Sequence, residues 1–245
     1  MIYHLIIAIQ FIVVSSSAPG KEYTASMFGA RSDGKTINTG SIQKAIDFIH
    51  ENGGGTLVFY TGRYLTGGIR LKSNVHMKLE DGAVLVGSSS PFDYNSSAGE
   101  RALISAEGQE NIAITGHGYI DGNAEALLKN MNELDKKDLL VDSVALKPAL
   151  IGFIDCKEIN LQEINLWQSA GAVQKFGGCS NISISKIVIK NSGAGFPSMI
   201  FYECAKVTLK ESYIESSGKP LEWKGDRKGI TIEKTVNQNG STITL

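Results

Sequence analysis

The chain has 245 residues, of which 42% are apolar, and a formal net charge of −1 at pH 7. This composition is sufficient for a substantial core. The near-neutral balance, with 24 basic residues, argues against nucleic acid as the main partner.

The first 18 residues form a separate segment. An apolar run, Leu5–Val14, is followed by small residues, Ser15–Ala18, of the kind found before a signal-peptidase cut. The run is shorter than the roughly 20 residues that span a bilayer. Because no Lys or Arg precedes it, a buried terminal strand is the alternative. We predict a signal peptide at residues 1–18, a mature domain at residues 19–245, and a secreted protein, extracellular or periplasmic, without a stable membrane span.

A helix is predicted shortly after this leader. Asn38 or Thr39 can cap its N-terminus, and the glycines at 53–55 end it. Its apolar residues recur at helical spacing: Ile42, Ala45, Ile46 and Ile49. At the start of a stack of strands, such a helix would cover the open interior of the first coil.

Short β-rich segments bounded by Gly, Asn or Asp come next, and each is predicted to be a strand. They are Thr56–Tyr60, Gly68–Leu71, Val75–Leu79, Val84–Val86, Asn111–Thr115 and Tyr119–Ile120. The charge-rich segment Lys129–Asp142 interrupts this pattern. We interpret it as a solvated excursion with helical character.

Three later segments repeat one another: Phe153–Leu166, Phe176–Ile189 and Phe201–Ile214. Each begins with phenylalanine, reaches a cysteine three positions later and then alternates apolar with polar residues. Spacings of 23 and then 25 residues are too short for separate domains but suit the coils of a solenoid. The chain is therefore predicted to be a rod of stacked strands.

The shared register of Cys156, Cys179 and Cys204 predicts a ladder of buried thiols inside this rod. A disulfide between two of them is the alternative. Neighbouring coils lie about 4.8 Å apart, which places stacked Cβ atoms slightly beyond the separation that a disulfide prefers.

Strand alternation separates inward from outward positions in the repeats. The predicted inward residues are Ile151, Phe153, Gln174, Phe176, Met199 and Phe201, continued by Leu221 and Trp223. We interpret the aromatic ones as a core ladder rather than a sugar-stacking platform. The outward residues are Gly152, Ile154, Lys175, Gly177, Ile200, Tyr202, Glu222 and Lys224. They form either a working surface for a linear polymer or an ordinary solvated face.

Several stretches resemble glycoside hydrolase family 28, the polygalacturonase-like proteins of the pectin-lyase-like superfamily. They include Phe28–Thr36, Ile42–Ile46, Gly53–Leu57, Tyr64–Gly68, Leu71–Val75, Asn111–Gly122 and Lys147–Phe153. The resemblance implies an all-β fold, a single-stranded right-handed parallel β-helix with a short N-terminal capping helix. It also implies hydrolysis of α-linked galacturonan by a protonated carboxyl and an ionised carboxylate.

The sequence departs from the family at the positions that should carry these acids. The family's Asn-Thr-Asp-Gly-Ile-Asp strand is matched by a segment that has Pro197 and Ile200 in place of the aspartates. Its Gly-Asp-Asp turn is matched by Gly218 and Lys219. The sequence Gly116–Gly118 reads Gly-His-Gly but lies in an earlier landmark, so it does not supply the family's histidine. Among the cleft positions that can be matched to the family, only Lys224 is the residue type that the family has there.

The catalytic residues therefore remain open: Glu203, Glu222 and Asp226 lie near the expected cleft, and Glu222 and Asp226 are the weak substitutes. We predict a protein that binds a polysaccharide that contains uronate. Lys175, Lys224 and Arg227 are expected to contact uronate carboxylates, and Tyr202 or Glu222 to contact sugar hydroxyls. The alternatives are an active hydrolase with relocated carboxylates and a truncated, non-functional family member. No cofactor and no metal site are predicted, and the oligomeric state does not follow from the sequence.

Overall fold

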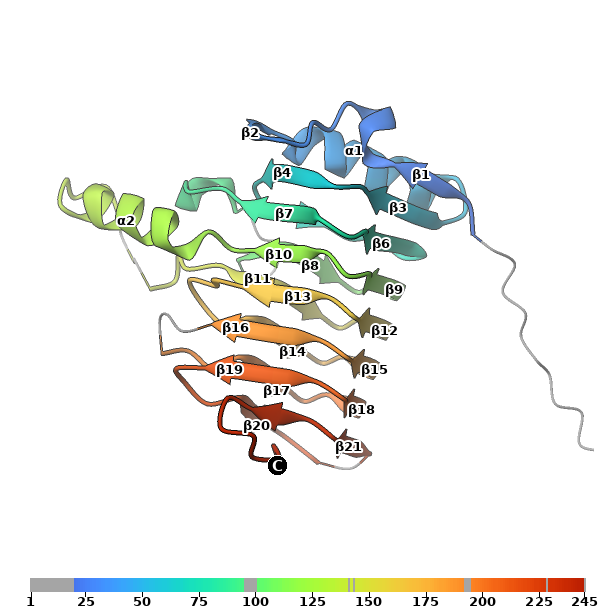
Figure 1. Cartoon of the computed structure of the whole chain (residues 1–245), viewed down its shortest axis with the longest axis vertical. Coiled ribbons are helices and arrows are strands. Elements are labelled where there is room, and N and C mark those ends of the chain that lie inside the picture. Colours follow the sequence, from blue (N-terminus) through green and yellow to red (C-terminus); the bar gives the residue numbers. More distant parts are fainter. Residues whose placement is uncertain are drawn as a thin grey trace, which may run out of the picture.

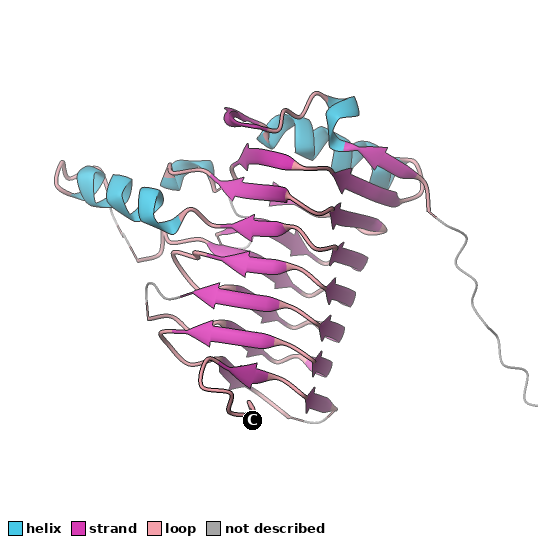
Figure 2. Cartoon of the chain, viewed as in Figure 1, coloured by secondary structure: helices cyan, strands magenta, loops and turns pink. Residues whose placement is uncertain are grey.

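The computed structural model describes residues 20–94, 101–140, 142, 144–191, 195–227 and 229–244. Its strands are stacked in three parallel sheets that wind around one elongated core (Figure 1). The predicted fold, a right-handed parallel β-helix, is confirmed. Helices are confined to the first coil, one lateral excursion and two short turns (Figure 2).

The strands of each sheet come from successive coils. Sheet A contains β1 (Glu22–Thr24), β3 (Gly55–Phe59), β6 (Val75–Leu79), β9 (Glu110–Thr115), β12 (Lys157–Gln162), β15 (Ser180–Ser185), β18 (Ala205–Lys210) and β21 (Ile230–Glu233). Sheet B contains β2 (Asp33–Ile37), β4 (Gly62–Thr66), β7 (Ala83–Gly87), β10 (Tyr119–Asp121), β13 (Asn165–Trp167), β16 (Val188–Asn191), β19 (Tyr213–Ser216) and β22 (Val236–Asn237). Sheet C contains β5 (Ile69–Arg70), β8 (Ala102–Glu107), β11 (Ala149–Ile154), β14 (Gln174–Gly177), β17 (Met199–Tyr202) and β20 (Leu221–Lys224).

All six strands predicted before the repeats are present with boundaries shifted by two residues at most. The sequence pattern missed β1, β2, β4 and β8. Two of these, β1 and β2, belong to the first turns of the solenoid, where side chains on both faces stay partly exposed and alternation is weak.

The aromatic ladder lies in the core as predicted. The ring centroids of Phe153 and Phe176 are 5.9 Å apart, and those of Phe176 and Phe201 are 5.2 Å apart. Trp223 extends the ladder at 5.1 Å from Phe201 but is only half-buried, because it lies on the last strand of sheet C. These rings face the interior, so they cannot serve as a sugar platform.

Gln174 is the polar member of this inward row and is fully buried. Neither its amide nitrogen nor its amide oxygen has a hydrogen-bond partner among the described residues. The backbone N–H of Gln174 is satisfied by the Ser198 carbonyl at 2.8 Å. The buried side chain thus carries the desolvation penalty of an unsatisfied amide.

The capping helix is α1 (Thr39–Glu51), and its buried stripe is the predicted one. Its ends differ in detail from the prediction. The Asn38 side chain makes no capping bond to the helix but accepts from Arg31 N and donates to Leu65 O, which ties the helix entrance to β4. Thr39 Oγ1 accepts from Gly67 N at 2.7 Å.

The excursion contains α2 (Ala124–Asp135), which starts five residues before the charged segment that suggested it. It is not fully solvated, because Ala124, Leu127 and Met131 are buried. Two 3₁₀ turns, η1 (Ala25–Phe28) and η2 (Pro91–Asp93), complete the helical elements of the described chain. At the other end of the rod, Val236 pairs antiparallel with Thr242, and Ile243 is buried beneath the last coil.

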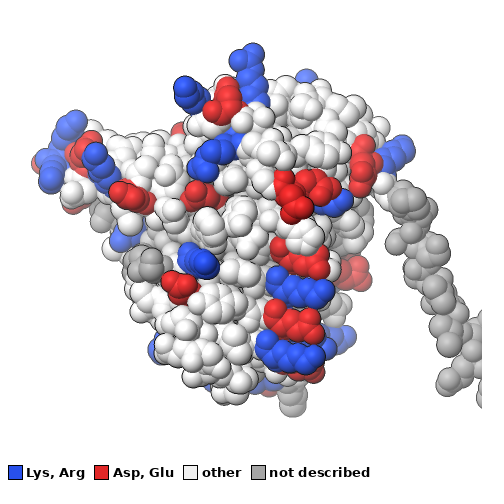
Figure 3. All heavy atoms as spheres, in the orientation of Figure 1, with Lys and Arg blue, Asp and Glu red and all other residues white. Residues whose placement is uncertain are grey.

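Ion pairs connect neighbouring coils on the corner between sheets A and B. Lys186 lies 3.3 Å from Glu163, and Lys234 lies 3.6 Å from Glu211. Acidic and basic side chains alternate from coil to coil down one side of the molecule (Figure 3). The hydrogen bond from Lys186 lowers the pKa of the Glu163 carboxyl. Each such exposed pair contributes little to the free energy of unfolding. The pairs at this corner therefore help to set the register between coils more than they stabilise the fold.

The three cysteines are free and buried, which confirms the thiol ladder over a disulfide. Their Sγ atoms donate to backbone carbonyls, as in Cys156 to Ile154 O at 3.2 Å and Cys204 to Tyr202 O at 3.4 Å. Hydrogen bonds to Cys156 and Cys204, together with burial, raise the pKa of the Cys179 thiol.

These thiols are therefore expected to be inert in the folded protein. An aromatic disulfide reagent should release no thiolate product under native conditions and three equivalents after unfolding in urea. Fast labelling of even one cysteine in the folded state would contradict the buried ladder.

The predicted leader at residues 1–18 lies outside the described residues. Among the described residues, no helix is long and apolar enough to cross a membrane.

Candidate functional site

A groove of about 740 Å³ runs over the outer face of sheet C. Its floor comes from β11, β14 and β17, and its walls come from the loop before β11 and the loop before β17. The lining includes four basic residues, Arg101, Lys147, Lys175 and Lys224, and two acidic ones, Asp155 and Glu203. The groove is therefore basic overall and follows the axis of the rod.

Register within sheet C explains the shape of the floor. Gly152, Lys175, Ile200 and Glu222 form one outward row, and Ile154, Gly177, Tyr202 and Lys224 form the next. Gly177 interrupts the second row between two larger side chains. A Cβ placed at Gly177 would meet no heavy atom of the described residues within 4 Å. This gap, bounded by Ile154, Lys175 and Tyr202, is here called the Gly177 seat.

Aromatic and cationic groups surround the Gly177 seat. Tyr202 is 52% exposed, so its ring face is available to a ligand. Across the groove, the Lys147 ammonium lies 5.7 Å from the centroid of Phe196. An exposed ring beside fixed cations is a suitable arrangement for a sugar that carries a carboxylate.

The corner from sheet C to sheet A supplies the two acids of the groove. Asp155, Gly178 and Glu203 occupy the same place on three successive coils, all in the left-handed region with φ of 52°, 60° and 50°. A Cβ on Gly178 would meet the Asp155 carboxylate, so a larger residue there would require that side chain to move. Two coil spacings separate Asp155 from Glu203, about 9–10 Å at the backbone.

The structure divides the predicted site residues into two groups. Lys175, Ile200, Tyr202 and Lys224 line the groove. Glu222 lies beyond the lining and pairs with Lys224 at 3.0 Å. Asp226 and Arg227 also lie outside it, in the exposed turn after β20.

Of the positions matched to the family's acids, Ile200 lines the groove, and the other three do not. Pro197 is in the loop before β17 and is half-buried, while Gly218 and Lys219 are in the turn before β20. A Cβ on Gly218 would meet the Phe196 carbonyl, which explains the glycine.

Sequence reasoning missed Lys147, Asp155 and Phe196, which all line the groove. None lies on an outward strand position of a repeat, so alternation could not single them out. Lys147 follows the excursion, and Asp155 follows the end of β11. The one available signal was the turn position that Asp155 shares with Glu203, directly before a cysteine in both repeats.

A metal centre has no support here. No group of three or more His, Cys, Asp or Glu side chains is placed to hold an ion within the part of the chain that the structure describes.

Comparison with known proteins gives a consistent result. The model of glycosyl hydrolases family 28 matches residues 60–242. A proposed glycosyl hydrolase from Parabacteroides merdae has a solved structure with a TM-score of 0.87, 35% sequence identity, and coverage of 92% of this chain and 99% of that one. The family 28 exopolygalacturonase of Yersinia enterocolitica has the same fold, with a TM-score of 0.79 at 21% identity over 90% of this chain and 49% of that one.

A curated relative is the exo-poly-α-D-galacturonosidase of Dickeya chrysanthemi. It is 33% identical over 129 residues, which cover 46% of this chain and 21% of that protein. The chain thus spans about a fifth of the length of this curated relative, whereas it spans nearly all of the Parabacteroides protein.

Proposed function

The chain belongs to glycosyl hydrolases family 28, and from that premise we propose that it binds an acidic, uronate-containing polysaccharide along the sheet C groove without cleaving it by the family's aspartates. The observation that carries the proposal is the Gly177 seat. It offers an open backbone position and an exposed tyrosine within a groove lined by lysines.

The charges of the groove favour an anionic polymer over a neutral one. Lys175 lies two residues before Gly177 on β14, Lys147 lies in the wall before β11, and Lys224 extends the basic lining by two coils beyond Lys175. Ammonium groups bind carboxylates through charge-assisted hydrogen bonds, and these are stronger than neutral ones. The relative from Dickeya chrysanthemi is named for a polymer of this kind, a poly-α-D-galacturonate.

The absence of family-type catalysis is proposed from the residue types at the matched positions. Ile200 and Lys219 offer no carboxyl for proton transfer, and neither does Pro197 or Gly218. The predicted leader at residues 1–18 adds the proposal that the protein acts outside the cytoplasm, where such polymers are encountered.

Affinity electrophoresis in gels that contain polygalacturonate tests the proposal. Retardation is expected for the wild-type protein, to decrease as salt is raised. Lys175→Ala should weaken binding about tenfold, because a charge-assisted hydrogen bond is lost. Lys210→Ala is the matched control, since Lys210 pairs with Glu233 on sheet A at 3.1 Å, and it should leave binding unchanged. Equal retardation of both variants and wild type, or none at all, would contradict the proposal.

A hydrolytic alternative is favoured by one observation, the placement of Asp155 and Glu203 on either side of Gly178. Their backbones are about 9–10 Å apart, and both side chains are long enough to bring the carboxyl groups into the range of roughly 6.5–9.5 Å found in inverting glycosidases. One carboxylate would take a proton from a water molecule while the oxygen of that water bonds to the anomeric carbon. The other carboxyl would give its proton to the departing glycosidic oxygen.

Reducing-end release from polygalacturonate distinguishes this alternative from binding alone. If it holds, Asp155→Asn and Glu203→Gln each abolish release, while Glu222→Gln does not, because Glu222 lies outside the groove lining. Binding without any release by the wild-type protein is the result expected from the main proposal.

A further inference from the structure

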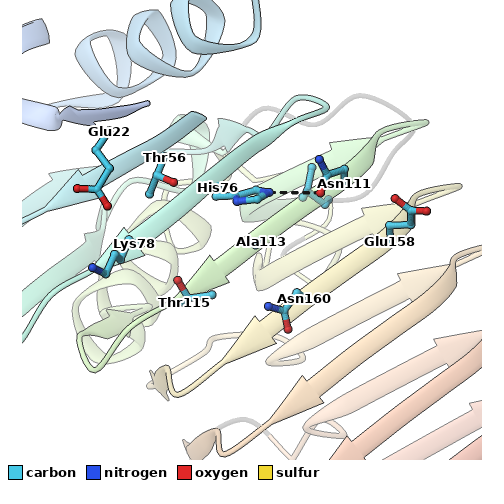
Figure 4. A pocket seen from close by; sticks show the side chains of 10 residues that line it. Glu22, Thr56, His76, Lys78, Asn111, Ala113, Thr115, Glu158 and Asn160 are labelled. Carbon is cyan, nitrogen blue, oxygen red and sulfur yellow. Dashed lines mark hydrogen bonds between the residues drawn. The ribbon is translucent and has the colours of Figure 1, made fainter. Parts of the chain in front are cut away.

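A second concave site lies on a different face of the rod. It is a hollow of about 410 Å³ on the outer side of sheet A, beyond the corner at which Asp155 and Glu203 border the sheet C groove. Figure 4 shows the side chains that line it, which come from β1, β3, β6, β9 and β12. Nothing in the groove or in the family's cleft involves these residues.

The hollow results from one short side chain between two longer ones. In the outward row of sheet A, Ala113 lies opposite His76 on one neighbouring coil and Asn160 on the other. Because the coils are about 4.8 Å apart, His76 and Asn160 stand about 10 Å from each other across the Ala113 methyl group. That width matches a single pyranose ring rather than a polymer chain.

The rim is partly fixed before any ligand arrives. Asn111 Oδ1 lies 3.4 Å from His76 Nε2 (Figure 4), and Asn111 Nδ2 donates to Asn74 Oδ1 at 2.8 Å. Asn111 and Glu158 both adopt left-handed φ values, 54° and 55°, at the start of their strands. This conformation takes their side chains out of the regular alternation and places them on the rim.

The rim mixes hydrogen-bond donors and acceptors. Glu158 and Asn160 offer a carboxylate and an amide, and Thr56 and Thr115 offer hydroxyls. None of these four side chains has a hydrogen-bond or ion-pair partner within the described chain. A ligand with several hydroxyl groups, each both donor and acceptor, would satisfy such a rim.

The acidic charge of the lining excludes anionic ligands. Glu22 and Glu158 are acidic, and the only cation of the lining, Lys78, already pairs with Glu80 at 2.7 Å. An anion such as a uronate would therefore be repelled. A metal ion has no clustered set of ligands among the described residues.

We infer that this hollow binds one neutral sugar residue, seated on the Ala113 methyl group and hydrogen-bonded by the rim. The hollow shares no lining residue with the sheet C groove, and it favours a neutral ligand where the groove favours an anionic one. A protein with both would hold an acidic polymer on one face and an uncharged sugar unit on another.

Amide chemical shifts of the ¹⁵N-labelled protein test this with two probes, D-galactose and D-galacturonate, which differ in one carboxylate. Galactose should shift the β6, β9 and β12 amides with a dissociation constant on the order of 1–10 mM, as expected for so small a ligand. Galacturonate should not shift them. Ala113→Leu fills the hollow from an outward position and should abolish the galactose shifts.

Two further variants separate binding in the hollow from binding in the groove. Asn160→Ala removes rim contacts without touching the core and should weaken galactose binding fivefold or more. Gly177→Leu alters only the groove and should leave the galactose shifts unchanged. Absence of sheet A shifts with galactose, equal shifts with both sugars, or undiminished shifts in Ala113→Leu and Asn160→Ala would overturn the inference.

Discussion

Gly177→Leu is expected to abolish polygalacturonate binding, with a loss of about 100-fold or more, because the new side chain occupies the seat that the sugar needs. The backbone at Gly177 imposes no requirement for glycine, and the added atoms enter open space. The thermal midpoint should therefore stay close to that of the wild type. Affinity electrophoresis and a thermal melt measure the two quantities on the same sample.

The matched control is Gly40→Leu, on the exposed side of α1. A Cβ at Gly40 also meets no neighbouring heavy atom within 4 Å among the described residues, so the two substitutions are sterically comparable. Binding should survive in this control. If Gly177→Leu binds as well as Gly40→Leu, the polymer does not lie across the seat, and the proposed path along sheet C is wrong.

Phe176→Ala is expected to lower the free energy of unfolding by about 3–5 kcal/mol, the usual cost of removing a buried aromatic ring. Phe176 contacts Phe153 edge-to-face and stacks on Phe201, so its loss removes ring contacts to both neighbouring coils at once. In a solenoid, stability depends on such interfaces between neighbours. The thermal midpoint should fall by roughly 10 °C.

Phe92→Ala provides the comparison, because Phe92 is 53% exposed in η2 and contributes no ring to the ladder. Its effect on stability should stay within about 0.5 kcal/mol. Urea titration followed by circular dichroism measures both variants. Equal midpoints for Phe176→Ala and Phe92→Ala would mean that the stacked rings do not hold the coils together.

The sequence predicted best where a periodic rule applies. Within an extended strand, side chains alternate between faces, so the positions of Phe153, Phe176 and Phe201 followed directly from their spacing to the cysteines. The same rule identified Lys175, Tyr202 and Lys224 as outward, and all three line the groove. Helical spacing likewise identified the buried stripe of α1.

Alternation gave no information at corners and loops. Asp155, Asn111 and Glu158 have left-handed backbones, which redirect the chain and break the period of two. Lys147 and Phe196 reach the groove from loops whose course is set by packing. Glu222 was expected in the cleft, but the lining ends before it, and its carboxylate pairs with Lys224.

The sequence by itself therefore determined that this chain winds into a parallel β-helix and which residues fill its interior. It also predicts that the family's acid positions hold Pro197, Ile200, Gly218 and Lys219. Only the tertiary structure decided where the rod is hollowed. A hollow depends on side chains of neighbouring coils: Gly177 lies between Ile154 and Tyr202, and Ala113 between His76 and Asn160. These neighbours are 23 to 47 residues apart along the chain, and irregular coil lengths hide their pairing until the strands are in register.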